Sequence, residues 1–257
     1  MSKHTIATGD IYQLGEHRLA CGDCRNTKLI KKLLGKDSVD LILTDPPYGV
    51  AYVEGKRGFL GGKDHEAIAN DHEQSDEEYQ AFTKDWIAAV IEHMAKKNSI
   101  YIFNSDKMIF PLRAGMEEAG CKFAQMLIWL KTHAVMGRLD YLPQHEILLY
   151  GWYGTHAFRK SKDKSILIYP KPSKSVLHPT MKPVGLLRRL ILNSSKIGDL
   201  VYDPFGGSGS TLIAAEDTKR RCMMIEMDAK YCRVIIDRFE KHTGVKAVPL
   251  SNTDHVR

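Results

Sequence analysis

The stretch Val39-Asp40-Leu41-Ile42-Leu43-Thr44-Asp45-Pro46-Pro47-Tyr48 decides the fold. Its first six residues form an apolar run with one polar interruption, which is typical of a strand buried on both faces of a parallel sheet. Two prolines follow, and because proline cannot donate to a strand ladder, the strand is expected to end at Asp45. Ligands of open α/β sheets bind at the carboxyl ends of the strands, so the pattern predicts that this carboxylate faces a ligand.

The four residues Asp45 to Tyr48 suit a planar ligand that carries an amino group. Asp45 and the carbonyl of Pro46 can accept hydrogen bonds from the amine, while the ring of Tyr48 stacks on the ligand's face. A strand-ending turn that happens to contain a tyrosine would have the same sequence. A second motif is therefore needed to decide between the two interpretations.

That second motif is a glycine-rich segment, Asp203-Pro204-Phe205-Gly206-Gly207-Ser208-Gly209-Ser210-Thr211. It lies between an expected strand over 199–202 and a helix that opens at Thr211. Glycines at such a turn let the backbone approach a ligand and leave free N–H groups at the helix start. Their spacing fits the dinucleotide pattern Gly-x-Gly-x-x-Gly poorly. A further expected strand over 222–225 ends at Glu226, which is placed to accept hydrogen bonds from ribose hydroxyls.

Together with His178-Pro179-Thr180-Met181-Lys182-Pro183, these motifs resemble those of the β-class amino-group DNA methyltransferases, the adenine-N6 and cytosine-N4 enzymes that use S-adenosylmethionine. In that class the catalytic motif precedes the cofactor motif along the chain, as it does here. The resemblance runs from about residue 9 to about residue 244. It implies an α/β, Rossmann-like methyltransferase fold: seven mostly parallel strands, the last one antiparallel, in a circularly permuted motif order.

The resemblance also implies a role for each motif. Asp45, Pro46, Pro47 and Tyr48 would be catalytic. Asp23 would accept from the amino group of the cofactor's adenine, although an acid leading into a helix explains it equally well. The residues expected at the cofactor are Asp23, Asp45, His178, Thr180, Lys182, Asp203, Pro204, Phe205, Gly206, Gly207, Ser208, Gly209, Ser210, Thr211, Glu226 and Met227.

Two further segments are expected near the substrate. Residues 49–75 show no periodicity and contain several glycines, which predicts a mobile loop beside the site. A short basic stretch over about 153–177 lies where the family places its target-recognition segment, so phosphate contact is favoured over a merely solvated face. Trp129 and Lys131 resemble a family element that supports the base pocket, with simple packing as the alternative. The expected DNA contacts are Lys56, Arg57, Arg138, Arg159, Lys160, Lys162, Lys164, Lys171 and Lys174.

Composition limits the class of protein. With 257 residues, 43% of them hydrophobic, the chain can form one catalytic domain over residues 1–257. No apolar run is long enough to span a bilayer, and the first residues lack a secretory signal, so we expect a cytoplasmic protein encoded by a bacterium or phage. A net charge of +6 permits a double-stranded DNA partner. Cys21 and Cys24 have zinc-like spacing without a second ligand pair, so no metal is expected, and a homodimer is an expectation of the class only.

The reaction predicted from these residues is direct methyl transfer to the N6 amine of an adenine flipped out of the duplex. Asp45 and the Pro46 carbonyl would each accept one amine proton, and Asp45 would offset the positive charge that develops on nitrogen. Asp rather than Ser at the first motif position favours adenine within the family. Three alternatives remain: cytosine-N4 methylation, a DNA-binding module without catalysis, and a protein or RNA methyltransferase. The last is disfavoured because related enzymes of that kind usually carry the cofactor motif first.

Overall fold

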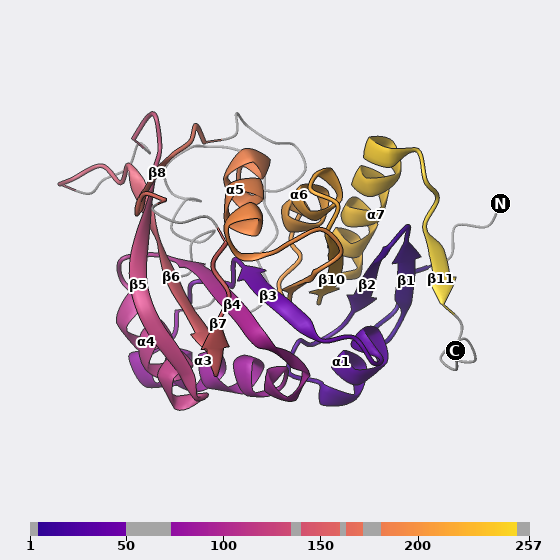
Figure 1. The fold of residues 1–257 in the computed structure, drawn as a ribbon, viewed down its shortest axis with the longest axis horizontal. Helices are drawn as coiled ribbons and strands as arrows, with labels where there is room; N and C mark the ends of the chain where they lie inside the picture. The colour runs from indigo at the N-terminus through magenta and orange to yellow at the C-terminus, as the bar shows by residue number, and fades with distance from the viewer. Residues whose placement is uncertain (1–4, 50–72, 135–139, 160–162, 172–180, 251–257) are drawn as a thin grey trace.

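In the computed structural model the chain is described over residues 5–49, 73–134, 140–159, 163–171 and 181–250 (Figure 1). Its helices are α1 Thr27–Leu34, α3 Asp76–Ala88, the short 3-10 helix η1 Ile91–His93, α4 Ile109–Glu118, α5 Val184–Ser194, α6 Ser210–Asp217 and α7 Ala229–Thr243. Its strands are β1 Ile11–Leu14, β2 His17–Cys21, β3 Val39–Thr44, β4 Met94–Asn104, β5 Cys121–Leu130, β6 His145–Tyr153, β7 Thr155–His156, β8 Ile166–Ile168, β9 Leu200–Asp203, β10 Arg221–Glu226 and β11 Val248–Leu250.

The strands form one sheet in the order β11-β1-β2-β10-β9-β3-β4-β6-β5-β8, with β7 paired to β4. From β2 to β4 every neighbouring pair is parallel. β6 is antiparallel to both β4 and β5, so it is the single reversed strand among the seven central ones. The predicted α/β class and permuted motif order are confirmed, because β3, which ends just before Asp45, precedes β9, which carries Asp203, in the chain.

The strand count differs from the prediction of seven. The described residues form eleven strands, because β1, β8 and β11 extend the two edges of the seven-stranded core and β7 adds a short pairing to β4. β7, β8 and β11 have only two or three residues each, too few to produce a recognisable hydrophobic alternation. The reversed strand β6 also lies inside the sheet, between β4 and β5, and not at its end.

Helices cover both faces of the sheet. α5, α6 and α7 lie on one face, and α1, α3 and α4 lie on the other (Figure 1). Strand β3 is buried by both layers of helices. Leu41 and Leu43 pack into the core beneath α5, α6 and α7, whereas Val39 and Ile42 pack into the core beneath α1, α3 and α4. A strand buried on both sides must be apolar at nearly every position, which is the pattern seen in the sequence.

Two of the helices begin at the caps that the sequence indicates. Asn26 accepts from the backbone of Lys28 and Leu29 at the start of α1. At the start of α3, Ser75 and Glu78 form the reciprocal capping box. These caps satisfy backbone N–H groups at the first turns and so fix where α1 and α3 begin.

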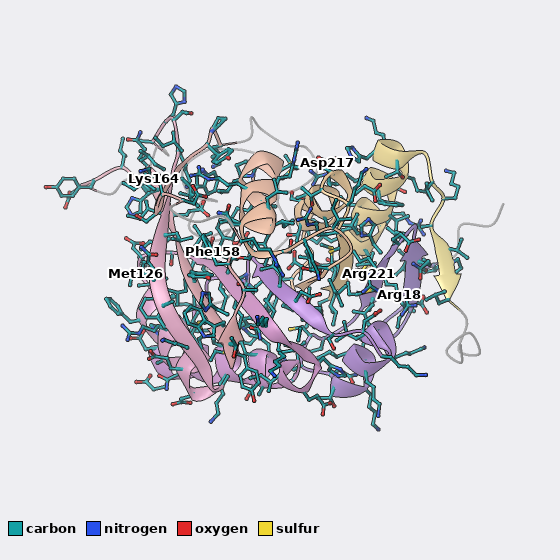
Figure 2. All side chains as sticks on the ribbon, in the orientation of Figure 1. Arg18, Met126, Phe158, Lys164, Asp217 and Arg221 are labelled. Carbon is teal, nitrogen blue, oxygen red and sulfur yellow. The ribbon has the colours of Figure 1, made fainter. Side chains whose placement is uncertain are left out.

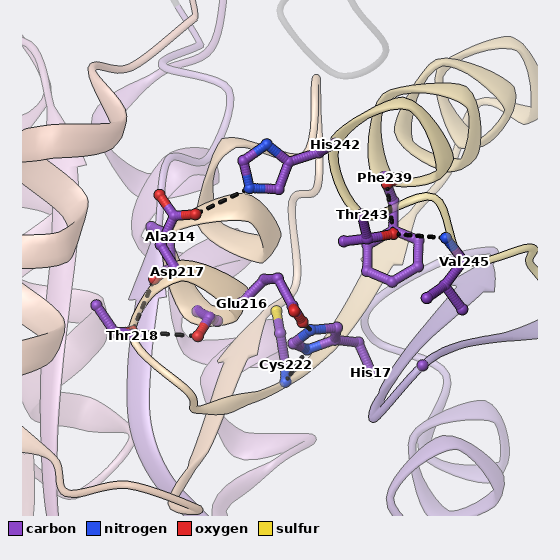
Figure 3. Close-up of polar contacts among 12 residues, drawn as sticks. His17, Ala214, Glu216, Asp217, Thr218, Cys222, Phe239, His242, Thr243 and Val245 are labelled. Carbon is purple, nitrogen blue, oxygen red and sulfur yellow. Dashed lines mark hydrogen bonds and ion pairs between the residues drawn. The ribbon is translucent and has the colours of Figure 1, made fainter.

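The antiparallel strands β1 and β2 form a hairpin near one edge of the sheet, called the edge hairpin below. A buried histidine, His17 of β2, holds this hairpin to α6 and β10 (Figure 3). Nδ1 of His17 accepts from the backbone N–H of Cys222 at 2.9 Å. Nε2 therefore carries the ring proton and donates it to Glu216 at 2.7 Å. Burial lowers the pKa of His17, and hydrogen bonding to Glu216 opposes that shift only in part. The imidazole is thus held in one neutral tautomer.

All five cysteines lie in described parts of the chain, and all are buried free thiols. No helix within the described ranges has the length and apolar character that crossing a membrane requires. Most of the loop predicted over 49–75 lies outside the described residues.

Candidate active site

The two predicted motifs meet where neighbouring strands β3 and β9 end. Residues Leu41 and Ile42 pair with Val201 and Tyr202, so both carboxyl ends reach the same rim of the sheet. The Thr44 hydroxyl donates to Oδ1 of Asp203 at 2.7 Å, in a buried contact. The two halves of the site are thereby joined by a side-chain hydrogen bond as well as by the strand ladder.

Asp203 fixes the turn that follows it. Its Oδ1 also accepts from the backbone N–H of Phe205 at 3.1 Å. Burial raises the pKa of Asp203 to about 7, and the hydrogen bonds from Thr44, Thr211 and Phe205 limit the rise. The carboxyl group is buried, and its hydrogen bonds to Thr44 and Phe205 shape the start of the glycine loop.

The glycine loop approaches the protein closely on its inner side. A Cβ on Gly206 would come within 2.9 Å of Met224, and Gly209 has a left-handed φ of +77°. Arg238 of α7 donates to the carbonyl of Ser208 at 2.8 Å and to the hydroxyl of Ser210 at 3.0 Å. The loop is therefore held at the N-terminus of α6, and side chains at Gly206 and Gly209 would press on Met224 and Ile235.

Glu226 stands at the end of β10, beside this loop. Its Oε2 accepts from the backbone N–H of Gly207 at 2.7 Å, and its Oε1 accepts from that of Asp228 at 2.8 Å. Burial raises the pKa of Glu226 to about 7 despite these two bonds. Each carboxylate oxygen retains lone pairs for further donors, as the predicted contact with ribose hydroxyls requires.

Asp23 reaches the same edge, because the N–H of Gly22 bonds to the carbonyl of Glu226 at 2.9 Å. The Asp23 carboxylate, however, pairs with Arg25, whose Nη2 lies 2.8 Å from Oδ2. Hydrogen bonding to Arg25 lowers the pKa of Asp23. The acid is ionised and already has a partner.

Phe205 of the glycine loop packs between two aromatic rings of α3. Its ring centroid lies 5.8 Å from that of Phe82 and 5.6 Å from that of Trp86. These contacts are of the tilted and edge-to-face kinds that aromatic rings favour. The turn after β9 is thus anchored from both sides of the sheet, by Arg238 on one and by α3 on the other.

Asp45 is the centre of a charged cluster that the sequence only partly predicts. Its Oδ2 forms an ion pair with Nζ of Lys182, and its Oδ1 accepts from the hydroxyl of Tyr48 at 2.8 Å. Nζ of Lys182 also lies 3.2 Å from Oε2 of Glu146, whose Oε1 is 2.9 Å from Nζ of Lys131. The negative charges of two carboxylates are therefore balanced by the positive charges of two ammonium groups beside the end of β3.

Burial raises the pKa of Asp45, Lys182 opposes the rise, and the charge of Glu146 adds to it. Burial would raise the pKa of Glu146 too, but Lys182 and Lys131 outweigh it and lower that pKa to about 2. For Lys182, burial would lower the pKa, but the charges of Asp45 and Glu146 raise it instead. Glu146 is consequently the carboxylate of the cluster that stays most firmly ionised.

Glu146 was not singled out in the sequence. It is the second residue of β6, and its partners Tyr48 and Lys182 lie far away along the chain, so no local pattern marks it. Lys131 was expected beside Trp129 in a supporting role, and the structure places its side chain against Glu146, almost fully buried. Trp129 itself is buried in the core and donates to the carbonyl of Tyr169 at 2.9 Å.

A hydrogen-bonded chain steadies the two prolines. Asn104, at the end of β4, donates to the hydroxyl of Tyr79 at 2.8 Å, and this hydroxyl donates to the carbonyl of Pro47 at 3.0 Å. Because β4 runs parallel to β3, Asn104 lies at the same rim of the sheet as Asp45. The backbone after Asp45 is therefore fixed by α3 and β4 as well as by proline.

Several predicted site residues lie outside the described parts of the chain: His178, Thr180, Lys56, Arg57, Arg138, Lys160, Lys162 and Lys174. Of the predicted DNA contacts, Arg159, Lys164 and Lys171 are described, and all three are exposed. Lys164 lies near β8 at the outer edge of the sheet (Figure 2). The one acid of that segment, Asp163, is bound by Arg189 at 2.6 Å, so the exposed charges of the described part are positive.

Across the described ranges, no group of three or more His, Cys, Asp or Glu side chains is arranged to hold a metal ion.

A strand-end carboxylate, a glycine loop that opens a helix after the neighbouring strand, and an acid at the end of the next strand define a nucleotide-cofactor enzyme of the Rossmann-like class. Comparison with known proteins identifies the class further. Residues 39–237 match the model of the N6/N4 DNA methylase family. The Type II methyltransferase M.HpaI of Haemophilus parainfluenzae is 27% identical over 243 residues, covering 84% of this chain and 73% of that protein.

Solved structures share the fold. The complex of M1.HpyAVI with S-adenosylmethionine aligns with a TM-score of 0.61 at 23% identity, covering 86% of this chain and 98% of that one. The cytosine-N4-specific PvuII DNA methyltransferase aligns with a TM-score of 0.65 at 17% identity, covering 91% and 86%. The chain belongs to the N6/N4 DNA methylase family, whose methyl donor is S-adenosylmethionine.

Proposed function

We propose that this DNA methyltransferase modifies the exocyclic N6 amine of adenine in double-stranded DNA, through Asp45, Pro46, Pro47 and Tyr48. The observation that carries the proposal is the position of Asp45, a partly buried carboxylate one residue beyond β3, across from the glycine loop that follows the neighbouring strand β9. Cofactor and substrate pockets at adjacent strand ends lie within reach of each other.

The adenine amine is a weak nucleophile because its lone pair is delocalised into the ring. If Asp45 accepts one amine proton in a hydrogen bond and the Pro46 carbonyl accepts the other, the lone pair is turned out of the ring plane. The carboxylate then offsets the positive charge that grows on nitrogen as it attacks. Tyr48 supplies a ring for stacking, which offsets part of the cost of flipping the base, about a few kcal/mol.

The loop from Asp203 to Thr211 fits the family's cofactor. Gly206 and Gly209 pack against Met224 and Ile235 on the protein side of the loop, and Glu226 holds carboxylate lone pairs beside it. When bound, S-adenosylmethionine supplies an electrophilic methyl group. We place its ribose at Glu226, with Asp23 and Met227 on the adenine side, and its methionine end toward Lys182 and the 178–180 segment.

The DNA backbone is expected to follow the basic segment over about 153–177, where Arg159, Lys164 and Lys171 are exposed. Such contacts bind phosphate without reading sequence, and they position the duplex so that one base can enter the pocket at Asp45. The name of the Haemophilus parainfluenzae relative, a Type II methyltransferase, supports a place in restriction–modification. The fold shared with the PvuII enzyme keeps cytosine-N4 methylation as the second candidate.

The test is chemical identification of the product. Purified protein is incubated with S-adenosylmethionine carrying a labelled methyl group and with unmethylated plasmid DNA, which is then digested to nucleosides and separated by mass. Labelled N6-methyldeoxyadenosine, formed much more slowly by the Asp45→Asn variant, is the expected result. Labelled N4-methyldeoxycytidine would overturn the adenine assignment, and unlabelled DNA would overturn the proposed function.

A further inference from the structure

Asp45 shares both of its side-chain hydrogen-bond donors with a second carboxylate. The hydroxyl of Tyr48 lies 2.8 Å from Oδ1 of Asp45 and 3.1 Å from Oε2 of Glu146. The ammonium of Lys182 pairs with Oδ2 of Asp45 and lies 3.2 Å from the same Oε2 of Glu146. A phenol has one proton to donate, so Tyr48 can serve only one of the two acids at a time.

This sharing matters because Asp45 cannot bind Lys182 and Tyr48 and accept a proton from the target amine with the same oxygens at the same time. In the arrangement described above, one of its oxygens is occupied by an ammonium and the other by a hydroxyl. An incoming amine needs a carboxylate oxygen to accept its proton, and the growing charge on nitrogen needs a negative charge that is not already neutralised. Lys182 therefore has to loosen its hold on Asp45 when the amine arrives.

Glu146 is placed to accept the Lys182 ammonium in place of Asp45. It stands at the start of β6, and its other oxygen is fixed by Lys131 at 2.9 Å. The side chains of Lys131 and Lys182 are 6% and 7% exposed, so both ammonium groups are held within the protein beside Glu146. Because Nζ of Lys182 is already within reach of Glu146, the exchange requires a reorientation of one ammonium and one hydroxyl, with no movement of the backbone.

Resting on the proposed function, we propose that Glu146 is a positioning residue that accepts the Lys182 ammonium and the Tyr48 hydroxyl when Asp45 engages the target amine. Lys131 is part of the same device, because its charge keeps Glu146 anionic and its bond keeps the carboxylate in place. No covalent step is involved. Hydrogen-bond donors move from one acceptor to another, and Asp45 is freed for the nucleobase.

The proposed role of Glu146 predicts changes in the pKa of Asp45. Among the residues that the structure describes, the charged and titratable groups around Asp45 are Lys182, Tyr48 and Glu146, with Lys131 behind Glu146 and Asp203 across the strand end. The charge of Glu146 raises the pKa of Asp45 and that of Lys182 lowers it. A Glu146→Gln change should therefore lower the pKa of Asp45, since it removes a negative neighbour and leaves Lys182 to Asp45 alone. A Lys131→Gln change should raise that pKa.

The first experiment follows methyl transfer in single turnover, with saturating S-adenosylmethionine and oligonucleotide duplex. Glu146→Gln should slow the transfer step about tenfold or more, a size within the range of coupling between contacting residues. The affinity for S-adenosylmethionine should stay unchanged, and the acidic limb of the rate profile should move to lower pH. In a Lys182→Met background the same Glu146→Gln change should have less than about a threefold effect, because the ammonium to be accepted is gone.

A second readout does not depend on activity. The carboxyl carbon of Asp45, labelled with ¹³C and assigned through the Asp45→Asn variant, is titrated by NMR in the wild type, Glu146→Gln and Lys131→Gln proteins. Opposite shifts of the Asp45 pKa in the two variants support the proposal. Equal rates in wild type and Glu146→Gln, additive effects in the Lys182→Met background, or an unmoved Asp45 pKa would overturn it. If the wild type labels no DNA, the proposed function fails, and the NMR titration still decides whether Glu146 is coupled to Asp45.

Discussion

The hydroxyl of Thr44 donates to Oδ1 of Asp203 at 2.7 Å, in the interior of the protein, and so ties the strand that ends at Asp45 to the strand that ends at the glycine loop. The two residues are 159 positions apart in the chain. The distance between the two ligand-facing turns therefore depends on a single hydroxyl as well as on the pairing of β3 with β9.

We predict that Thr44→Val destabilises the protein and weakens cofactor binding. Valine has the same shape but leaves the buried Asp203 oxygen without this donor, which should lower the free energy of unfolding by about 1–3 kcal/mol. Urea denaturation and calorimetric titration with S-adenosylmethionine measure the two effects. Thr44→Ser, which keeps the hydroxyl, is the matched control, and an equal loss in both variants would contradict a role for the hydrogen bond.

Asp45→Asn should reduce the rate of methyl transfer about 10²- to 10³-fold, because asparagine cannot offset positive charge on the attacking nitrogen. Rapid-quench measurement of the single-turnover rate checks this. Asp40→Asn is the control from the same strand: Asp40 accepts from the backbone of Leu200 at the opposite end of β3, and asparagine can keep that bond. A similar fall in rate with Asp40→Asn would mean that damage to β3 explains both results.

Cofactor affinity should weaken as the pH falls below about 7. Burial raises the pKa of Glu226 to about 7, and only its ionised form can accept from both ribose hydroxyls and backbone donors. Asp203 titrates in the same range, since its pKa is also raised to about 7, so the wild-type curve alone does not separate the two.

The Glu226→Gln variant makes that separation. We expect it to bind S-adenosylmethionine more weakly than the wild type at pH 8 and to show a flatter dependence between pH 8 and pH 6. Calorimetry over that range is the measurement. A Glu226→Gln curve as steep as that of the wild type would assign the pH dependence to Asp203 instead.

Acid should release the edge hairpin from α6. Because burial lowers the pKa of His17 below the unfolded value of about 6.5, the unfolded chain binds the proton more readily than the folded protein does. The stability that neutral His17 contributes is present above pH 6.5 and is lost as the pH falls through that value. Protonation would also end the bond from Cys222, which needs a lone pair on Nδ1.

His17→Asn keeps an acceptor near the position of Nδ1 but cannot titrate. We expect it to be about 1 kcal/mol less stable than the wild type at pH 8, through loss of the bond to Glu216, and less sensitive to pH between 7 and 5. Denaturant unfolding at several pH values measures both. Equal pH slopes in the two proteins would show that other groups account for the acid sensitivity.

Removing a basic side chain of the predicted recognition segment should weaken binding to all DNA sequences alike. For Lys164→Ala the slope of log affinity against log salt should become less steep by about 1, since one phosphate contact releases about one counterion. Fluorescence anisotropy with two unrelated duplexes measures it. Lys96→Ala, an exposed lysine near the start of β4, is the control. Unchanged salt dependence in Lys164→Ala would remove Lys164 from the interface.

The features that were predictable from the sequence depend on local constraints. The strand ending at Asp45 is marked by a buried apolar run followed by prolines, and the turn at Asp203 is marked by glycines before a helix. The rule that ligands bind where parallel strands end predicts that both motifs face a ligand. That β3 lies directly beside β9 is known only from the structure.

The features that the sequence left open depend on contacts between distant segments. Glu146 is the second residue of a mostly apolar strand, and only its contacts with Lys182 and Lys131 give it a role. Nothing local indicates that Lys182 pairs with Asp45, because the contact spans 137 positions. Short edge strands such as β8 are equally hidden, since their pairing is determined by the neighbour they join.

The sheet places its first and last described strands next to each other: Ile11 of β1 pairs with Leu250 of β11 (Figure 1). A peptide link between those strands, with the chain opened at a surface loop elsewhere, would preserve every strand neighbour and every contact at the rim. The catalytic and cofactor motifs could then exchange their order in the gene without any change in the enzyme's interior. For a protein with this architecture, reordering its motifs is a modest step in evolution and a practical route for engineering.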